Sequence, residues 1–513
     1  MKSVLFLLLV AISCFNIFAA PIEITILFTN DVNGRPLAFS YNQEDNLGGL
    51  PARASLIKKL AGDKKKNNVL VVDTGNFLLG RPESNLFDGL PDIVGMNLCG
   101  YDVVGLGYGE IYKSKKYFDV LNKNANFYIL SSNIKEVTFS GSSKEIADAE
   151  FIKKFGNVTV GVFSVTSEDN KTFLTEQAQK EFTILDPLKE AKNSVENIRG
   201  KFKADIVIAL TTLGYYEDNS KIGSNTLASN VSGIDIIIDG NTGLKLEEPV
   251  VINKTKIVQA FRYGLFVGEI KLKVDNKKIV DFQYKLHPVN YKENGEYVGT
   301  KLDEDPAVLK AIKDKMKNYD TNLNKKLVTI KSGALDVKSI RQDENPLGNL
   351  ICDALLDFTK AQIAFQNAGG IVDDQVDISK FNRKSLDKII KYDNSVVVLN
   401  LTGKEIREIL ETSFKRRGYG AFLQVGGLRL TYSKNENLLS NVKVKDLELN
   451  DETLYKVAIN SWLANGGDDY SIFKSIPVKS DYGILVREVV YNYLEKKANY
   501  SLSIDGRMNI IGE

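Results

Sequence analysis

Short polar turns that directly follow apolar runs hold the residues with the clearest capacity for chemistry. Asp31 ends the turn Thr29-Asn30-Asp31, and hydroxyl, amide and glycine residues make up the turns at 74–76, 211–214 and 240–243. Loops at strand ends are where layered α/β proteins usually place their sites. These turns therefore mark the first candidate site.

Histidine, the most versatile catalytic side chain, is almost absent. His287 is the only one in 513 residues. A single imidazole excludes a multi-histidine metal centre, and any histidine-dependent triad would have to use this residue. His287 stands between Leu286 and Pro288 on a predicted strand, away from the polar turns. We therefore interpret it as structural.

Charge and cysteine content narrow the function classes. The chain has 67 basic and 65 acidic residues, a formal net charge of +2. That balance gives no general electrostatic footprint for nucleic acid, so no nucleic-acid partner is predicted. Three cysteines are too few for a disulfide framework. Cys99 and Cys352 each lie in an apolar stretch and are predicted to be buried thiols.

The N-terminus has the pattern of an export signal. Met1-Lys2 precedes an apolar run at 4–12, and Ala19-Ala20 precede Pro21. This predicts a signal peptide over residues 1–20 and a periplasmic or extracellular protein. Lipid attachment at Cys14, within a loose lipobox, is one alternative, and a buried first strand or helix is another. No later run is long enough to predict a transmembrane segment.

Behind the turns, the pattern predicts elements of two kinds of domain. Apolar runs at 22–28, 69–73, 158–165, 205–210 and 234–239 read as buried strands, and helical spacing lies between them. This alternation predicts layered α/β architecture. Residues 303–325 have the spacing of one long connecting helix, capped by Asp305 and Pro306. Beyond 330, helices, strands and glycine loops predict an α+β domain.

Four sequence motifs in the last third of the chain indicate a family resemblance. They are Leu347-Gly348-Asn349-Leu350-Ile351-Cys352-Asp353-Ala354, Asn367-Ala368-Gly369-Gly370-Ile371, Phe422-Leu423-Gln424-Val425-Gly426-Gly427 and Leu463-Ala464-Asn465-Gly466-Gly467-Asp468. In this order they resemble the secreted 5′-nucleotidase family, over nearly all of the mature chain. The resemblance implies a four-layered α/β/β/α metallophosphoesterase-like domain at 21–302, a connector helix at 303–328 and an α+β nucleotide-binding domain at 329–513.

The same resemblance implies that the family's metal centre is degenerate here. Where the family places metal ligands, this chain has Asp31, Asn33, Asn76, Tyr108, Thr212, Asn241 and Gly243. Only Asp31 retains the usual ligand. Gly109 and Tyr112 stand where the family has its catalytic histidine and the aspartate that orients it. We therefore expect no catalytic residues, no metal and no cofactor. The remaining oxygen donors leave a weak site for a hard divalent cation as an alternative.

The family's nucleotide-binding positions are better preserved. The resemblance implies that Tyr392 and Trp462 stack on a base, that Asp468 binds ribose hydroxyls, and that Asn367, Gly369 and Gly370 approach the ligand. Arg341 matches a phosphate-binding arginine, whereas Val372 replaces another arginine. The alternatives are ordinary ones. Tyr392 and Trp462 could be core aromatics, Asp468 a turn residue and Arg341 a solvated charge.

Three functions remain open from the sequence. The favoured one is an exported pseudoenzyme that binds a nucleoside or nucleotide through its C-terminal domain without efficient hydrolysis. The second is a residual phosphoester hydrolase of nucleotide catabolism that uses Asp31, Glu110 or a hard cation. The third is a non-enzymatic envelope or surface interaction protein with partners that the sequence does not identify.

Overall fold

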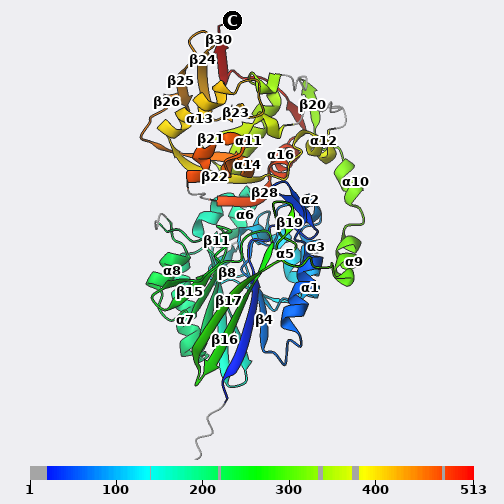
Figure 1. Ribbon diagram of the computed structural model, residues 1–513, viewed down its shortest axis with the longest axis vertical. Coiled ribbons are helices and arrows are strands. Elements are labelled where there is room, and N and C mark those ends of the chain that lie inside the picture. Colours follow the sequence, from blue (N-terminus) through cyan, green and yellow to red (C-terminus); the bar gives the residue numbers. More distant parts are fainter. Residues whose placement is uncertain are drawn as a thin grey trace, which may run out of the picture.

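The computed structural model describes residues 20–138, 140–217, 221–332, 339–371, 381–476 and 480–512. Cys14, Val372 and all but the last residue of the predicted signal peptide lie outside these ranges. The chain forms two domains of mixed helix and strand, stacked along the long axis of the molecule (Figure 1). The described part of the chain has no helix whose length and apolarity would let it cross a membrane.

A six-stranded sheet with the order β17-β16-β1-β4-β5-β6 forms one half of the N-terminal domain. β1 (Ile22–Thr29) and β4 (Val69–Asp73) run parallel, and their last residues pair as Thr29 with Asp73. This register places the turns that follow the two strands side by side. The other strands are β5 (Val103–Gly105), β6 (Tyr128–Leu130), β16 (Phe266–Asp275) and β17 (Lys278–Pro288).

A second six-stranded sheet, with the order β14-β15-β13-β12-β10-β9, faces the first. β12 (Ile206–Thr212) and β13 (Ile236–Asp239) are parallel and pair Thr211 with Asp239, so their following turns are also neighbours. The other strands are β9 (Glu150–Phe155), β10 (Val158–Thr166), β14 (Val250–Ile252) and β15 (Thr255–Val258).

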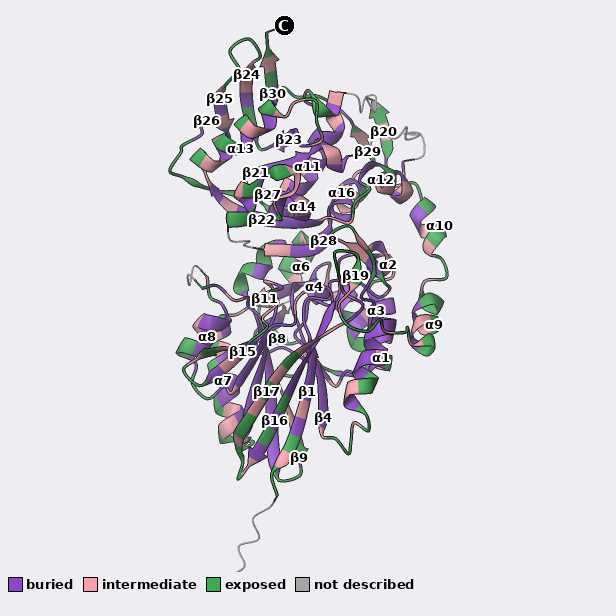
Figure 2. Cartoon of the chain, in the orientation of Figure 1, coloured by how far each residue is buried: buried purple, intermediate pink, exposed green. Residues whose placement is uncertain are grey.

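Helices cover the outer face of each sheet and complete four layers. Apolar side chains of β1, β4, β10 and β12 form one buried cluster between the sheets. The first sheet carries α1 (Leu50–Ala61), α3 (Leu90–Cys99) and α5 (Lys115–Asn124), and the second carries α7 (Pro187–Gly200) and α8 (Ser224–Asn230). Figure 2 shows exposed residues on helices such as α7 and along the edge strand β17, outside this buried cluster. The predicted α/β/β/α layering is confirmed.

The connector differs from the single helix predicted. It forms two helices, α9 (Pro306–Lys315) and α10 (Tyr319–Asn324), which run along one side of the molecule (Figure 1). Asp305 caps α9 by accepting hydrogen bonds from the Ala307 and Val308 N–H groups, at 3.0 Å each. The apolar spacing continues across Met316, but the backbone leaves the helical conformation at this residue. The single-helix prediction was wrong because apolar spacing alone does not require an unbroken helix.

The C-terminal domain has a five-stranded sheet, order β23-β21-β27-β22-β28, and a four-stranded sheet, order β26-β25-β24-β30. Its main helices are α11 (Pro346–Thr359), α12 (Arg383–Ile389), α13 (Gly403–Lys415) and α16 (Val486–Glu495). The strands are β21 (Ile363–Asn367), β22 (Ser395–Thr402), β23 (Leu423–Gly426), β24 (Leu428–Ser433), β25 (Leu438–Val444), β26 (Leu447–Glu448), β27 (Leu454–Asn460), β28 (Ser480–Leu485) and β30 (Met508–Ile511).

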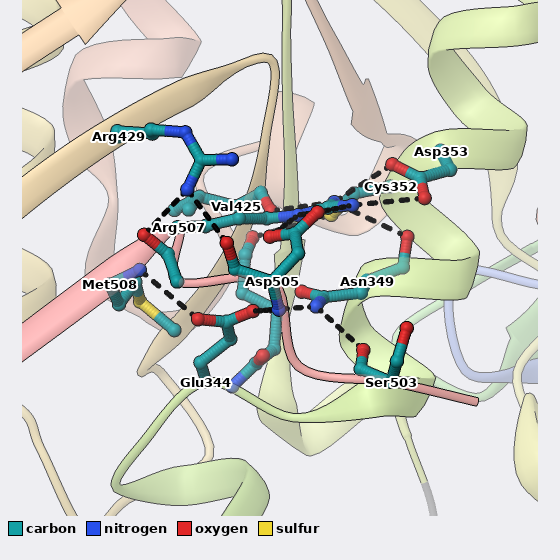
Figure 3. Close-up of polar contacts among 12 residues, drawn as sticks. Glu344, Asn349, Cys352, Asp353, Val425, Arg429, Ser503, Asp505, Arg507 and Met508 are labelled. Carbon is teal, nitrogen blue, oxygen red and sulfur yellow. Dashed lines mark hydrogen bonds and ion pairs between the residues drawn. The ribbon is translucent and has the colours of Figure 1, made fainter. Parts of the chain in front are cut away.

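Arg507 fastens the end of the chain to α11 (Figure 3). Its guanidinium pairs with Asp353 of that helix, with Nη1 2.8 Å from Oδ1, and with Asp505 of its own loop, with Nε 2.9 Å from Oδ1. Glu344, just before α11, accepts hydrogen bonds from the Asn349 side chain at 2.7 Å and from the Asp505 N–H at 2.8 Å. The Leu347–Ala354 motif thus connects the C-terminal residues 503–508 to the core of the domain.

Two sequence interpretations about single residues are confirmed. Cys99 and Cys352 are free and buried. His287 lies on β17, where its Nε2 is 3.0 Å from a carboxylate oxygen of Glu269 on the paired strand β16. That contact gives the histidine a structural role in the sheet.

Candidate functional site

The predicted strand-end turns converge on Asp31. Its Oδ1 accepts hydrogen bonds from the Asn76 side chain at 3.2 Å and from the Asn241 backbone N–H at 2.9 Å. Its Oδ2 accepts from the Asn30 side chain at 3.0 Å and from the same Asn241 N–H at 2.8 Å. Both carboxylate oxygens are therefore occupied by N–H donors from three turns.

The backbone of these turns explains why they contain asparagine. Asp31, Asn33, Asn76 and Asn241 have φ angles of 48°, 50°, 56° and 76°. Apart from glycine, asparagine and aspartate tolerate this left-handed region best. The turn geometry thus favours the residues that the chain has at these positions.

Other residues at the positions that the resemblance aligns with metal ligands make structural contacts. Thr212 Oγ1 lies 2.6 Å from Thr166 Oγ1 of the neighbouring strand. Tyr108, in α4 (Tyr108–Ile111), donates its hydroxyl to the Tyr482 carbonyl at 2.8 Å. Glu110, which the sequence offered as a hydrolytic residue, is fully buried and accepts the backbone N–H groups of Asn76 and Gly107 at 2.9 and 2.8 Å. Its carboxylate supports the turn.

Strand β28 of the C-terminal domain closes over the turns. Asp481 forms an ion pair with Arg262, and the Tyr263 hydroxyl lies 3.3 Å from the same carboxylate. Gly483 packs so closely on Asn33 that a Cβ atom there would lie 2.3 Å from Asn33 Cγ. The space left among Asp31, Asn33, Gly243 and the strand is about 10 Å³, room for about one water molecule.

As they lie, these residues do not fit a two-metal centre. Such a centre needs several imidazole or carboxylate ligands that converge on the ions. Here one carboxylate faces N–H donors, and burial raises the pKa of Asp31 above its usual range. Within the described residues, no three His, Cys, Asp or Glu side chains gather closely enough to hold a metal ion. The weak hard-cation site stays a prediction, since its oxygen donors remain compatible.

A second and larger cavity lies where the two domains meet. Its volume is about 590 Å³. Six of the seven predicted ligand-binding residues line it, namely Asn367, Gly369, Gly370, Tyr392, Trp462 and Asp468. The structure therefore brings these six to one place, although they are spread over about a hundred positions of the sequence.

A chain of side-chain hydrogen bonds holds the polar wall of this cavity. Asn460, at the end of β27, accepts the Leu463 N–H at 3.0 Å and so caps α14 (Ser461–Ala464), which carries Trp462. The Asn460 side chain donates to Asn367 Oδ1 at 2.8 Å, and Asn367 donates to Asp468 Oδ2 at 2.6 Å. The position of each polar residue is thereby tied to the helix that presents the tryptophan.

The two predicted stacking residues border the cavity without touching each other. Trp462 is partly buried, and its indole packs on Gly467, where a Cβ atom would lie 2.3 Å from the ring. Tyr392, in the loop between α12 and β22, is 51% exposed. Among the described residues, neither ring contacts another aromatic ring. Both rings line the cavity, and neither is fully buried as a core aromatic would be.

Arg341 lies apart from these residues. It ends a short 3₁₀ turn, it is exposed, and it is absent from the described lining of the cavity. Its carbonyl accepts the Gly418 N–H at 2.6 Å. The position matches the solvated charge that the sequence also allowed.

Sequence reasoning missed one wall of the cavity. The hairpin of β2 (Phe39–Tyr41) and β3 (Glu44–Leu47), from the N-terminal domain, contributes Ser40, Tyr41, Asn42, Gln43 and Asp45. No motif marks these residues, because their place depends on how the domains meet. Lys391, Asp393 and Asn394 also line the cavity and could have been inferred as neighbours of Tyr392.

Comparisons with known proteins agree with this architecture. A family model described as "5'-nucleotidase, C-terminal domain" matches residues 326–475. A 5′-nucleotidase of Vibrio vulnificus is 28% identical over 515 aligned positions, which cover 93% of this chain and 91% of that protein. A snake venom 5′-nucleotidase of Crotalus adamanteus is 26% identical and covers 96% and 90%.

Solved structures share the fold over the whole chain. The Haemophilus influenzae NAD nucleotidase superposes with a TM-score of 0.78 at 18% identity, covering 96% of this chain and all of that one. A 5′-nucleotidase precursor from Thermus thermophilus gives 0.54 at 24% identity, with the same coverage. The C-terminal family match, the full-length relatives and the common two-domain fold lead to one conclusion: the chain belongs to the 5′-nucleotidase family.

Proposed function

We propose that this chain binds a nucleoside or nucleotide in the 590 Å³ cavity and is a catalytically silent, or strongly impaired, member of its family. One contrast carries the proposal. The turns around Asp31 are filled by hydrogen bonds and by β28, whereas the cavity beside Tyr392 and Trp462 is open.

The residues at the turns support the loss of hydrolysis. Two-metal phosphoester hydrolysis needs an activated water and stabilisation of the charge on the transferred group. Asp31 is saturated by N–H donors, Glu110 is bonded to backbone N–H groups, and Gly109 has no side chain to give a proton. These contacts leave the turns without a free base, acid or cluster of anionic ligands.

The cavity supports binding. A volume of about 590 Å³ lies within the usual range of small-molecule sites. Stacking of a base on an aromatic side chain stabilises nucleic-acid complexes by about 1–3 kcal/mol per base. Asn367 and Asp468 offer amide and carboxylate groups to sugar hydroxyls at the same wall. The protein would thus take up or sense a nucleoside or nucleotide without changing it.

Export completes the proposal. The charged start, apolar run and small residues before Pro21 support secretion to the periplasm or beyond, with cleavage after Ala20 or lipid attachment at Cys14. In either compartment the bound species would come from the surroundings of the cell.

The test measures binding and turnover on one sample. The chain from Pro21 onward is titrated with nucleosides and 5′-mononucleotides by calorimetry and by the fluorescence of Trp462, the sole tryptophan. Phosphate release is assayed with Mg²⁺, Mn²⁺, Ca²⁺ or Zn²⁺ added. We expect saturable binding without phosphate release. We also expect Tyr392→Ala to weaken binding about tenfold, in line with the loss of one stacking contact. Tyr128→Ala, an equally exposed tyrosine outside the cavity, is the matched control.

Two results would overturn the proposal. Metal-dependent phosphate release that disappears in Asp31→Ala would identify a working hydrolase. An absence of binding by every nucleoside and nucleotide would leave the interaction-protein hypothesis.

A further inference from the structure

We propose that the cavity selects an uncharged nucleoside over the corresponding 5′-mononucleotide. This inference rests on the proposed function and specifies its ligand. It follows from the charge of the cavity wall, from the pairing of the arginines around it and from the closure of the turns beneath it.

The cavity wall is acidic. Among the described residues that line it, Asp393 is offset by two arginines, which leaves Asp45 and Asp468 against the single cation Lys391. A phosphate monoester carries between one and two negative charges at neutral pH. Its phosphate would meet more carboxylates than ammonium groups, so electrostatic repulsion would exceed attraction. A nucleoside carries no charge and meets no such repulsion.

The nearby guanidinium groups are already paired. Arg81 and Arg487 both bind Asp393, the latter with Nη2 2.5 Å from Oδ1. Arg416 donates to the Asp468 carbonyl and lies 3.3 Å from Asp469. Arginine is the side chain best suited to bidentate phosphate recognition. No arginine occurs among the described lining residues of the cavity, so this mode of recognition is missing.

A phosphate has no room in the Asp31 turns either. The 10 Å³ space there is bordered by Arg262, and the guanidinium of that arginine is paired with Asp481. Tyr41 of the hairpin packs edge-on against Tyr263, with ring centroids 5.2 Å apart, beside this ion pair. Arg35 lies over the same tyrosine, with its guanidinium carbon 3.5 Å from the Tyr263 ring centroid, and donates to the Gly483 carbonyl at 3.2 Å.

The groups that remain suit hydroxyls and a base. Asp468 can accept from a sugar diol, since among the described residues its one side-chain donor is the Asn367 amide, which binds Oδ2. Ser40, Asn42 and Gln43 bring neutral donors and acceptors from the opposite domain. Hydrogen bonds of this kind orient a neutral ligand without requiring a compensating charge.

The experiment compares matched pairs of ligands on the full mature chain. Adenosine, guanosine, uridine and cytidine are each titrated by calorimetry against their 5′-monophosphates at low and at 0.5 M salt. We expect the best-bound nucleoside to exceed its monophosphate at least tenfold in affinity at low salt, about 1.4 kcal/mol. The gap should narrow at high salt because salt screens the repulsion.

A charge variant tests the cause. Asp45→Asn should raise the monophosphate affinity more than the nucleoside affinity, whereas Asp281→Asn, an exposed carboxylate on β17, should change neither. Equal or tighter binding of the monophosphates would overturn this inference and leave the proposed function intact. No binding of any member of the four pairs would overturn both.

Discussion

Several carboxylates of the N-terminal domain are buried with little cationic compensation. Burial raises the pKa of Asp73 and of Asp92 to about 7, and that of Asp239 to about 6. Each therefore holds its proton in the folded protein at a pH where the unfolded chain has lost it. Such groups make the free energy of unfolding depend on pH, independently of any ligand.

Asp92 offers the clearest measurement, because it lies 1% exposed in the first turn of α3, away from the Asp31 turns. The pKa of Asp92 is about 7 in the folded protein and 3.8 in the unfolded chain, so between these pH values the folded state binds more protons than the unfolded state. Its stabilising contribution is therefore complete below about pH 4 and is lost as pH rises through 7. The full shift corresponds to about 4 kcal/mol. Urea unfolding from pH 4 to 8 should show a decline in the free energy of unfolding, and Asp92→Asn should make that decline shallower.

The control for this experiment is Asp63→Asn, because Asp63 is an exposed carboxylate. It should leave the pH dependence of unfolding unchanged. A slope as steep in Asp92→Asn as in the original protein would assign the whole titration to other groups, with Asp73 and Asp239 the next to test.

At the scale of elements, β28 joins the domains. Its central residues Asp481, Tyr482 and Gly483 contact Arg262, Tyr108 and Asn33 in turn. The Tyr482 ring also packs edge-on against Phe173, with centroids 4.5 Å apart. A strand at the edge of the C-terminal sheet is thus buried by the N-terminal domain, which removes an exposed strand edge.

Gly483 allows β28 to approach the turn at Asn33 closely, because it has no side chain. Its φ is +62°, and a Cβ atom would lie 2.3 Å from Asn33 Cγ. Gly483→Ala should therefore strain the strand and push the domains apart. We expect small-angle X-ray scattering to show a larger radius of gyration, and proteolysis between α9 and α10 to become faster.

Gly295→Ala separates the two effects. Gly295 also has a positive φ, +84°, but no heavy atom outside its immediate neighbours lies within 4 Å of a Cβ placed there. This variant should be destabilised by backbone strain alone, by about 1–2 kcal/mol, without a change in radius. An unchanged radius in Gly483→Ala would mean that the interface adjusts around the methyl group.

At the scale of the whole molecule, the cavity is lined by both domains, so the proposed ligand would contact both. Its walls come from the β2–β3 hairpin on one side and from the loops around Tyr392 and Trp462 on the other. A ligand that contacts both walls binds the closed arrangement better than an open one. The proposed ligand would therefore stabilise that arrangement by mass action.

A nucleoside at one hundred times its dissociation constant should stabilise the folded, closed protein by about 2.7 kcal/mol. The measurable results are a higher midpoint of thermal unfolding and slower proteolysis between α9 and α10. Tyr392→Ala, at the same nucleoside concentration, should show a smaller shift of both. A shift in the melting midpoint without slower proteolysis would place the ligand on the C-terminal domain alone.

The sequence predicted the features that depend on local apolar patterns or on motifs shared with the family. The core strands β1 and β4, the four layers and the grouping of Asn367, Tyr392 and Trp462 all followed from it. Helical spacing across Met316 predicted one connector helix and was wrong, because a change of backbone direction needs no change of apolar spacing. The hairpin wall and the β28 contact could not be inferred, since they depend on packing between residues hundreds of positions apart.

The close packing around Gly109 and Gly243 limits which side chains these two positions can accept. A Cβ at Gly109 would lie 2.9 Å from the Leu78 carbonyl, and one at Gly243 would lie 2.9 Å from Arg262 Nε. The sequence resemblance aligns both positions with histidines, and a side chain at either one would meet atoms that already occupy the space. Introducing histidine at Gly109 or Gly243 therefore requires the Leu78 carbonyl or the Arg262 side chain to move first. Single substitutions at these positions are thus poor candidates for building a metal centre into this fold.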